Sequence, residues 1–185
     1  MKILLSFCAL LIVVSSASSL KLKDDLGFEP CNPDNWGEGN IDVNPYPLPV
    51  VEGTQVDIKA LFQLDKKLDG DVDVKIKMVK TGIISIPIPC LEIRPGVFLG
   101  SCDYKLEEII TKYEDFLCPN FFPEGQECAF PLQAGEYGGK IEKITLPEIS
   151  DAVAALAKGT VKITLSVNRN EEEVFCIKGN LELAK

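Results

Sequence analysis

The chain has 185 residues, of which 46% are hydrophobic and 25% are charged, and it carries a formal net charge of −9 with no histidine. The acidic balance, without a basic run or a basic–aromatic stripe, argues against a nucleic-acid partner. The lack of histidine excludes Ser-His-Asp and Cys-His nucleophiles, so a carboxylate pair is the remaining route to acid–base catalysis. The acids fall in turns or alternate along strands, which is typical of solvated surface, and we do not expect an enzyme.

Residues 1–19 predict a secretory signal peptide. Lys2 carries a positive charge, an apolar run extends from Ile3 to Val14, and small residues follow up to Ser19. The run of about twelve residues is shorter than the ~20 that a spanning helix needs, so a membrane anchor is the weaker alternative. We expect a secreted, extracellular or lysosomal protein in which residues 20–185 form a single domain.

Six cysteines lie outside the predicted signal peptide: Cys31, Cys90, Cys102, Cys118, Cys128 and Cys176. An even number in an oxidising compartment predicts three disulfides, for which about fifteen pairings exist. The spacing favours two local pairs, Cys90 with Cys102 and Cys118 with Cys128, and leaves Cys31 for Cys176. Metal binding is the competing interpretation. It is disfavoured because the chain has neither Cys-x-x-Cys nor histidine, so we expect no metal and no cofactor.

Most of the chain has the two-residue period of β-strands. Apolar residues alternate from Gln55 to Leu64 and again from Val72 to Met78. With turn residues between them, these segments predict a β-hairpin that buries one face. Further strands are predicted at 83–88, 140–146, 160–167 and 174–183. The side chains expected in the core, facing either lipid or other side chains, are Phe62, Leu64, Val74, Ile76 and Leu165.

Two segments follow helical spacing instead. Apolar residues from Leu106 to Leu117 recur every three or four positions, with acidic residues between them, and predict one short amphipathic helix. A capping Ser150 and a terminal Gly159 indicate a helical turn. Together the elements predict an all-β protein, mainly an antiparallel, immunoglobulin-like β-sandwich or β-cup, with one short helix and three disulfides.

The segment between Cys90 and Cys102 is unusually apolar for a connection, which normally runs over the surface and is polar. Its large apolar residues are Leu91, Ile93, Val97, Phe98 and Leu99. Either they fold back into the core or they form the rim of an apolar cavity. The same two alternatives hold for the other candidate lining residues, which are Ile109, Phe116, Phe121, Phe122, Phe130 and Leu156.

The ordered cysteines, "NPYPLP" before the first long strand, "IPIPC", "CPNFFPEGQEC" and "VFCIKGNLEL" carry a resemblance to a known family. From Cys31 to Leu183 the chain resembles the ganglioside GM-two activator group of the ML (lipid-recognition) domain family. This resemblance implies a β-cup that holds lipid tails, with the three disulfide pairs given above. It also implies transient membrane contact and presentation of a glycolipid to a lysosomal hexosaminidase, in other words a non-catalytic enzyme activator in sphingolipid metabolism.

The resemblance has a departure that bears on function. Ala155 occupies the position of an exposed tryptophan that contacts membrane in the activator, so the apolar segment 91–99 is expected to take over this contact. With the resemblance, a lipid rim is favoured over a filled core. Two alternatives stay open: an extracellular carrier of fatty acids, sterols or semiochemicals without an enzyme partner, and an adhesion sandwich with a filled core.

Overall fold

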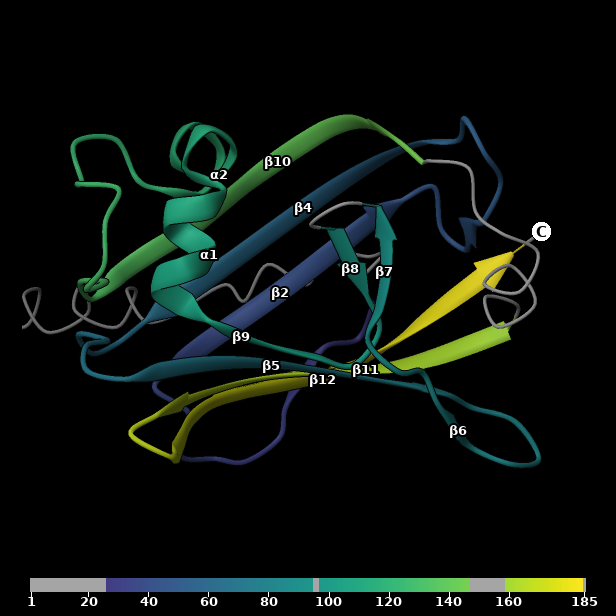
Figure 1. The fold of residues 1–185 in the computed structure, drawn as a ribbon, viewed down its shortest axis with the longest axis horizontal. Coiled ribbons are helices and arrows are strands. Elements are labelled where there is room, and N and C mark those ends of the chain that lie inside the picture. Colours follow the sequence, from purple (N-terminus) through teal and green to yellow (C-terminus); the bar gives the residue numbers. More distant parts are fainter. Residues whose placement is uncertain (1–25, 95–96, 147–158, 185) are drawn as a thin grey trace, which may run out of the picture.

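Two mainly antiparallel β-sheets face each other in the computed structural model, which describes residues 26–94, 97–146 and 159–184 (Figure 1). The predicted signal peptide and the predicted helical turn at 150–159 lie almost wholly outside these residues. The elements are β1 (Glu29–Pro30), β2 (Gly37–Asn44), β3 (Leu48–Pro49), β4 (Gln55–Leu64), β5 (Val72–Lys80), β6 (Ile86–Pro87), β7 (Leu91–Arg94), β8 (Val97–Leu99), β9 (Cys102–Lys105), α1 (Leu106–Lys112), α2 (Glu114–Phe121), β10 (Gly135–Thr145), β11 (Gly159–Arg169) and β12 (Glu172–Ala184).

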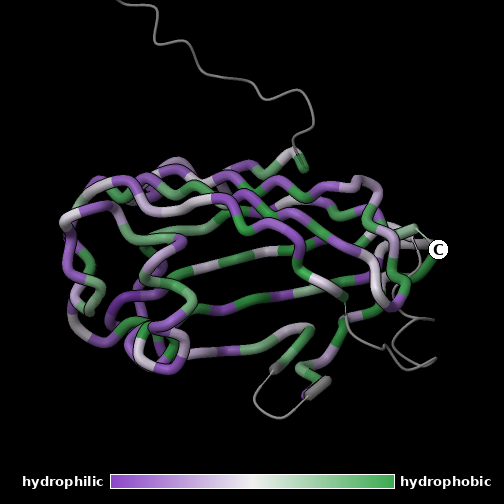
Figure 2. The backbone as a smooth tube through the Cα atoms, turned by 90° about the horizontal axis from the view of Figure 1, so that it is seen from above, coloured by the Kyte–Doolittle hydropathy of each residue, from purple (hydrophilic) through white to green (hydrophobic). Residues whose placement is uncertain are grey.

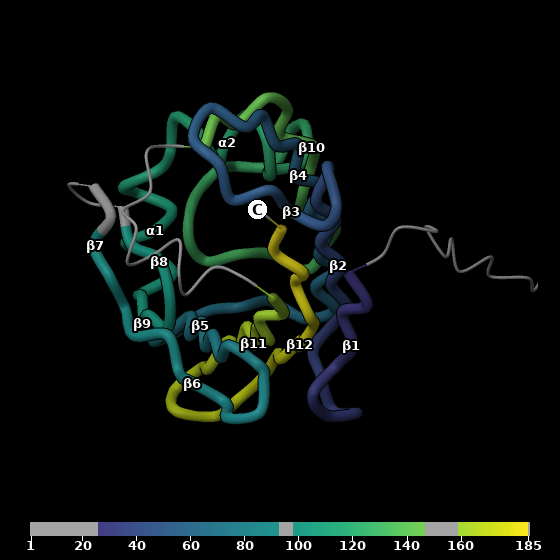
Figure 3. The backbone as a smooth tube through the Cα atoms, turned by 90° about the vertical axis from the view of Figure 1, so that its right-hand side faces the viewer, coloured from purple at the N-terminus to yellow at the C-terminus, as the bar shows by residue number. Residues whose placement is uncertain are grey.

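The larger sheet has seven strands, in the order β1-β12-β11-β5-β6, with β3 added to β12 and β9 added to β5. The smaller sheet has the order β10-β4-β2, and β7 pairs only with β8 as a separate hairpin. Seen from one end, the two sheets lie on different sides of the molecule, with β7, β8 and α1 along one flank and β1 and β2 along the other (Figure 3). The predicted all-β sandwich is therefore confirmed.

The alternation that predicted the strands is visible along the backbone, where hydrophobic and hydrophilic residues follow one another (Figure 2). It did not reveal which strands pair. The predicted hairpin of residues 55–78 is wrong, because β4 pairs with β2 and β10 while β5 pairs with β11. Residues between them carry the chain from one sheet to the other, and buried Leu68 forms a bridge with Leu132 at this crossing.

Other predicted elements differ in extent. The predicted strand at 83–88 is reduced to β6, Ile86–Pro87, because Pro87 cannot donate a ladder hydrogen bond and residues 82–84 bend. The single predicted helix is two helices that meet at Tyr113. Glu114 and Asp115 occupy the first turn of α2, where acidic side chains favour a new helix start.

One end of the molecule is closed by a hydrophobic cluster. Its buried members are Leu64, Leu68, Val72, Tyr137 and Val174. Trp36 packs against this cluster, and two cations lie over its ring, with Lys66 Nζ 4.9 Å and Arg169 Cζ 5.8 Å from its centre. The backbone N–H of Trp36 donates to the carbonyl of Val174 at 2.7 Å, which joins the start of β2 to β12.

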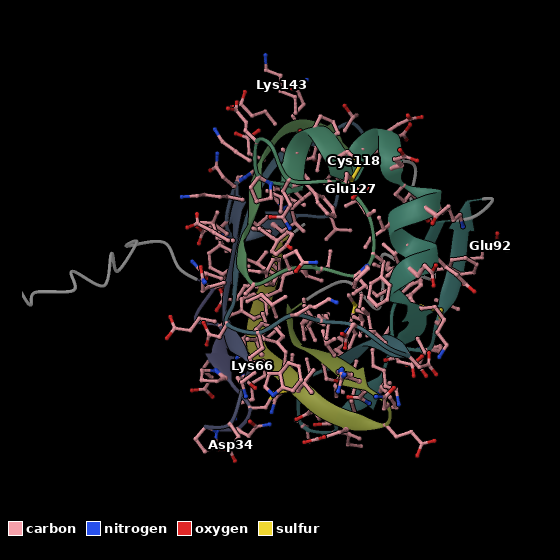
Figure 4. The ribbon with its side chains drawn as sticks, turned by 90° about the vertical axis from the view of Figure 1, so that its left-hand side faces the viewer. Asp34, Lys66, Glu92, Cys118, Glu127 and Lys143 are labelled. Atoms are coloured by element: carbon pink, nitrogen blue, oxygen red, sulfur yellow. A yellow bond between two sulfur atoms is a disulfide. The ribbon has the colours of Figure 1, made fainter. Side chains whose placement is uncertain are left out.

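The three predicted disulfides are confirmed as Cys31–Cys176, Cys90–Cys102 and Cys118–Cys128. The first links two cysteines that are 145 positions apart and ties the N-terminal segment to β12. The second joins the start of the β7–β8 hairpin to β9. The third joins α2 to the segment before β10, beside the labelled Cys118 in Figure 4.

Candidate functional site

The inward face of the larger sheet is a continuous apolar surface. On β5 and β11, Val74 is paired with Val167, Ile76 with Leu165 and Met78 with Ile163. Directly paired residues of antiparallel strands point to the same face, so these six side chains form three adjacent rungs. The next strand continues the rungs with Phe175 and Ile177, which are opposite Val167 and Leu165.

The inward face of the smaller sheet is also apolar. The register places the inward residues of β4 beside apolar residues or glycines of β2 and β10. These inward positions are Val56, Ile58, Ala60, Phe62 and Leu64 on β4, Ile41 and Val43 on β2, and Tyr137, Ile141 and Ile144 on β10. The contact between the rings of Phe62 and Phe175, 6.2 Å apart, shows that the two inward faces oppose each other.

The two faces do not seal each other along their whole length. Leu64 and Val72 at the closed end are buried, as are Val56, Val161 and Ile177 farther along, but most of the inward side chains are only half-buried. The half-buried inward residues include Ile41, Val43, Ile58, Phe62, Val74, Ile76, Met78, Ile141, Ile144, Ile163, Leu165 and Val167. All five residues expected in the core lie on the inward faces: Leu64 is buried, whereas Phe62, Val74, Ile76 and Leu165 are half-buried and retain solvent-accessible surface.

The outward faces are polar, which fixes the orientation of both sheets. On the smaller sheet Lys140 forms ion pairs with Glu142 at 2.7 Å and with Asp57 at 3.8 Å. On β9, hydrogen bonds from the Lys105 ammonium to Asp71 and Asp73 raise the pKa of Lys105. Figure 4 shows the charged side chains of Asp34, Glu92 and Lys143 at the periphery of the molecule.

The segment between Cys90 and Cys102 is a β-hairpin rather than a loop. Leu91 is paired with Leu99 and Glu92 with Phe98. Phe98 and Leu99 are exposed, at 41% and 36%, whereas Leu91 is half-buried. Lys112 Nζ lies 6.0 Å from the centre of the Phe98 ring, so the hairpin is beside α1. Ile93 and Val97 belong to β7 and β8, and only their backbone is described.

A second exposed apolar segment was missed in the sequence. It is the tip between β5 and β6, where Ile83 and Ile84 are 107% and 76% exposed and Ile86 is 47% exposed. This tip projects at the end of the molecule opposite α1 and α2 (Figure 1). The stretch from Val74 to Leu91 contains three lysines and no acid, in a chain with 28 acids. That signal was present in the sequence, but the isoleucines were assigned to a strand.

The remaining candidate residues divide into two groups. Phe122 and Phe130 pack against the cluster at the closed end, and Phe122 meets the Tyr137 ring edge-on at 5.5 Å. Ile109, Phe116 and Phe121 lie on the two helices, where Phe116 is 43% exposed. The rings of Phe116 and Phe121 contact each other, with their centres 6.1 Å apart. Leu156 lies outside the described residues.

Two grooves open on other surfaces of the described part of the chain. One, of about 470 Å³, lies beside α1 and is lined mainly by charged and polar residues, among them Asp71, Lys105 and Glu108. The other, of about 270 Å³, is lined by residues of β2, β4 and β10. The lining of the larger groove includes charges of both signs, three acids and two lysines. None of the described helices is long and apolar enough to cross a bilayer.

Comparisons with known proteins are limited to the fold. No protein-family model matches the sequence, and no characterised protein matches it. Among solved structures, the chain is similar to a Niemann-Pick type C2 protein from Japanese carpenter ant, with 14% identity and a TM-score of 0.46. The similarity covers 85% of this chain and 98% of that chain.

Proposed function

We propose that this protein is a non-catalytic lipid carrier that holds apolar tails between its two inward faces. The observation that carries this proposal is the solvent-accessible surface left on the apolar side chains in the middle of both sheets. A sandwich with a filled core buries such rows, because interiors pack to the density of organic crystals. The three disulfides support a secreted or lysosomal location, since disulfides persist in oxidising compartments.

The free energy of tail transfer is sufficient for such a carrier. Burying ~16 methylenes gains roughly 13 kcal/mol relative to water at ~0.8 kcal/mol each. A carrier needs only to approach the affinity of the bilayer for the same tail. The accessible rungs around Ile76 and Leu165 offer the apolar contacts that this requires.

Loading from a bilayer requires transient contact with a membrane surface. Two segments suit this contact: the β5–β6 tip with Ile83 and Ile84, and the β7–β8 hairpin with Phe98 and Leu99. Lys80, at the end of β5 beside the tip, adds a positive charge, and anionic membranes attract basic segments. The tip is thus a second membrane-contact segment beside the hairpin, for which this contact is predicted from the sequence.

The choice of lipid and partner rests on the resemblance alone. That resemblance extends the proposal to a glycolipid presented to a lysosomal hexosaminidase. The described residues favour neither of two alternatives: an activator that presents glycolipid to a hexosaminidase, or a carrier of fatty acids, sterols or semiochemicals that acts without an enzyme.

The proposal is tested by displacement of a neutral apolar fluorophore, N-phenyl-1-naphthylamine, from the folded protein. We expect saturable binding in the micromolar range or tighter, and displacement by phospholipid or glycolipid. Protein that melts cooperatively yet shows no saturable fluorescence would establish the filled-core adhesion sandwich instead.

A further inference from the structure

The outward face of the larger sheet carries a group of lysines. Strands β5, β11 and β12 lie side by side here, on the side of the molecule away from β4 and β10 (Figure 1). Three consecutive rungs present outward side chains, and they are Val79–Lys162–Asn180, Lys77–Thr164–Lys178 and Lys75–Ser166–Cys176. These rungs hold four lysines and no carboxylate, in a chain with a net charge of −9. We call Lys75, Lys77, Lys162 and Lys178 the lysine face.

The sheet gathers these lysines around Thr164. Lys77 and Lys178 are directly paired with Thr164 from either side, and Lys162 lies two positions away on the same face of β11. Directly paired residues have Cβ atoms ~5 Å apart, and alternate residues of one strand are ~7 Å apart. Because lysine stems are long and flexible, several ammonium groups are within reach of a single anionic group above Thr164.

Most of this charge is not used within the protein. The side chains of Lys75, Lys77 and Lys162 are exposed, and none of them has an ion pair or a hydrogen bond in the described part of the chain. The hydroxyls of Thr164 and Ser166, which lie between the lysines, also have no partner within residues 26–94, 97–146 and 159–184. The lysine face thus offers both charge and hydrogen-bond donors to a ligand.

Acidic residues border the lysine face without entering its centre. The bordering acids are Glu29, Asp73, Asp103 and Glu182. The carboxylates of Glu29 and Asp73 already form ion pairs with lysines, at 3.3 Å and 2.9 Å. The outward acids of the smaller sheet lie farther away, because packed sheets are ~10 Å apart, which exceeds the Debye length of ~8 Å at physiological salt. The net negative charge of the chain therefore does not cancel the local positive charge.

The composition of the lysine face favours a linear polyanion over a protein or a bilayer. Interfaces between proteins have aromatic and apolar residues at their centre and are depleted in lysine. Val79 and Cys176, the apolar members of the three rungs, are half-buried and buried, so the face offers no anchor of that kind. It also lacks the exposed isoleucines that suit the β5–β6 tip to a membrane. Clusters of lysine are typical of sites for heparin-like polymers.

We propose that the lysine face binds a sulfated polysaccharide, with a sulfate group held by Lys77, Lys162 and Lys178 beside the Thr164 hydroxyl. The disulfides support a compartment of the secretory route, where such polymers occur. The lysine face is on the opposite side of the sheet from the inward apolar rungs. Polysaccharide binding is therefore a further function, independent of lipid carriage.

The test measures binding of a heparin oligosaccharide to the folded protein by calorimetry. Hyaluronan, which has carboxylates but no sulfates, polyglutamate, and vesicles of phosphatidylserine and phosphatidylcholine are the competing ligands. The variant is Lys77→Gln with Lys162→Gln, and the same pair changed to arginine retains the charge. The matched control is Lys59→Gln with Lys143→Gln, which removes two lysines of the smaller sheet. Asp103→Asn removes a bordering acid.

Heparin is expected to bind the wild type at about 0.15 M salt and to bind more tightly than hyaluronan or polyglutamate. The glutamine variant should bind heparin about tenfold more weakly, with the slope of log affinity against log salt reduced by about two. The arginine variant and the Lys59–Lys143 control should match the wild type, and Asp103→Asn should bind severalfold more tightly. These substitutions change exposed side chains, so melting temperatures should stay close to that of the wild type.

Four results would overturn the proposal. The first is no binding of heparin by the wild type, and the second is an equal loss in the Lys59–Lys143 control, which would assign the effect to net charge. The third is tighter binding of polyglutamate, which would indicate an acidic protein partner. The fourth is vesicle binding that the glutamine variant loses while heparin binding is unchanged, which would assign the lysine face to a membrane.

Discussion

Phe62 and Phe175 meet edge to face across the two sheets, with their ring centres 6.2 Å apart and their planes at 71°. The contact is next to Gly39, whose missing side chain leaves the space that the two rings occupy. It lies close to the closed end of the sandwich, where Phe62 packs against the hydrophobic cluster. Beyond this contact, inward side chains such as Ile76 and Leu165 keep accessible surface, although Val56, Val161 and Ile177 are buried.

Replacing Gly39 with alanine is expected to destabilise the fold by about 1–3 kcal/mol, the usual cost of overpacking. A Cβ at this position would lie 2.8 Å from Phe62 Cδ1 and 3.0 Å from Phe175 Cζ. Urea unfolding followed by the fluorescence of Trp36 measures the change. Gly82→Ala is the control, because the nearest atom to a Cβ added there, the Ile84 carbonyl oxygen, would be 3.7 Å away. Equal stability of both variants would contradict the described packing.

Removing the Cys31–Cys176 disulfide by a double serine substitution is expected to cost roughly 5 kcal/mol at most, because it closes a loop of 145 residues. Removing Cys90–Cys102, which spans 12 residues, is expected to cost less on the same grounds. Thermal melting of the two double variants gives the comparison. A lower melting temperature for the variant without Cys90–Cys102 than for the variant without Cys31–Cys176 would show that the Cys31–Cys176 disulfide is not the more stabilising of the two.

Replacing Ile83 and Ile84 with serine is expected to change stability by no more than ~0.5 kcal/mol, because both side chains are exposed. The double variant should nevertheless extract lipid from anionic vesicles severalfold more slowly. Phe98→Ser with Leu99→Ser should act in the same direction. The control is Phe116→Ser, which alters an exposed aromatic on α2 at the other end of the molecule.

These variants also show whether the tip and the hairpin contact a membrane or belong to the packed core. Truncating a buried Phe or Leu costs about 2–5 kcal/mol. A large drop in melting temperature with unchanged extraction per folded molecule would show that the hairpin or the tip is core. Slower extraction by Phe116→Ser, to the same degree, would show that the effect is not specific to these segments.

Stability at alkaline pH is expected to depend on Tyr137. Burial raises the pKa of its phenol above the ordinary value of 10.0, despite hydrogen bonds to Gln126 and Gln133 that act in the opposite direction. As the pH rises, the phenol therefore ionises in the unfolded chain before it ionises in the folded protein. The contribution of the neutral Tyr137 to the free energy of unfolding is complete below pH 10.0 and declines as the pH rises towards the folded pKa. In Tyr137→Phe, the free energy of unfolding measured with urea should fall less steeply above pH 10.0 than in the wild type. An unchanged slope would contradict the assignment.

Much of the fold could be predicted, because alternation reports which residues of a strand face inward. The strand from Gln55 to Leu64 was predicted with the bounds observed for β4, and the disulfide spacing predicted all three pairs. Alternation does not report the partner strand, so β4 and β5 were joined in one hairpin although they belong to different sheets. Strand β2 was missed because Gly37 and Gly39 remove inward side chains from its period.

The candidate site was harder to predict than the strands. A filled sandwich and an open one have the same pattern of inward residues, so the accessibility of Ile76 and Leu165 follows only from the distance between the sheets. The exposed tip was missed for a related reason, because a run of isoleucines favours a strand by propensity. Packing, rather than propensity, leaves Ile83 and Ile84 without a covering element among the described residues.

Quenching of a single tryptophan by a brominated fatty acid tests most directly whether lipid tails lie between the sheets. In a Trp36→Phe background, Leu165→Trp places the reporter on the inward face of β11, and Thr164→Trp places it on the outward face of the same strand. The account predicts strong, saturable quenching in the Leu165→Trp protein and little in the Thr164→Trp protein. Equal quenching in both, or none in the Leu165→Trp protein, would contradict it.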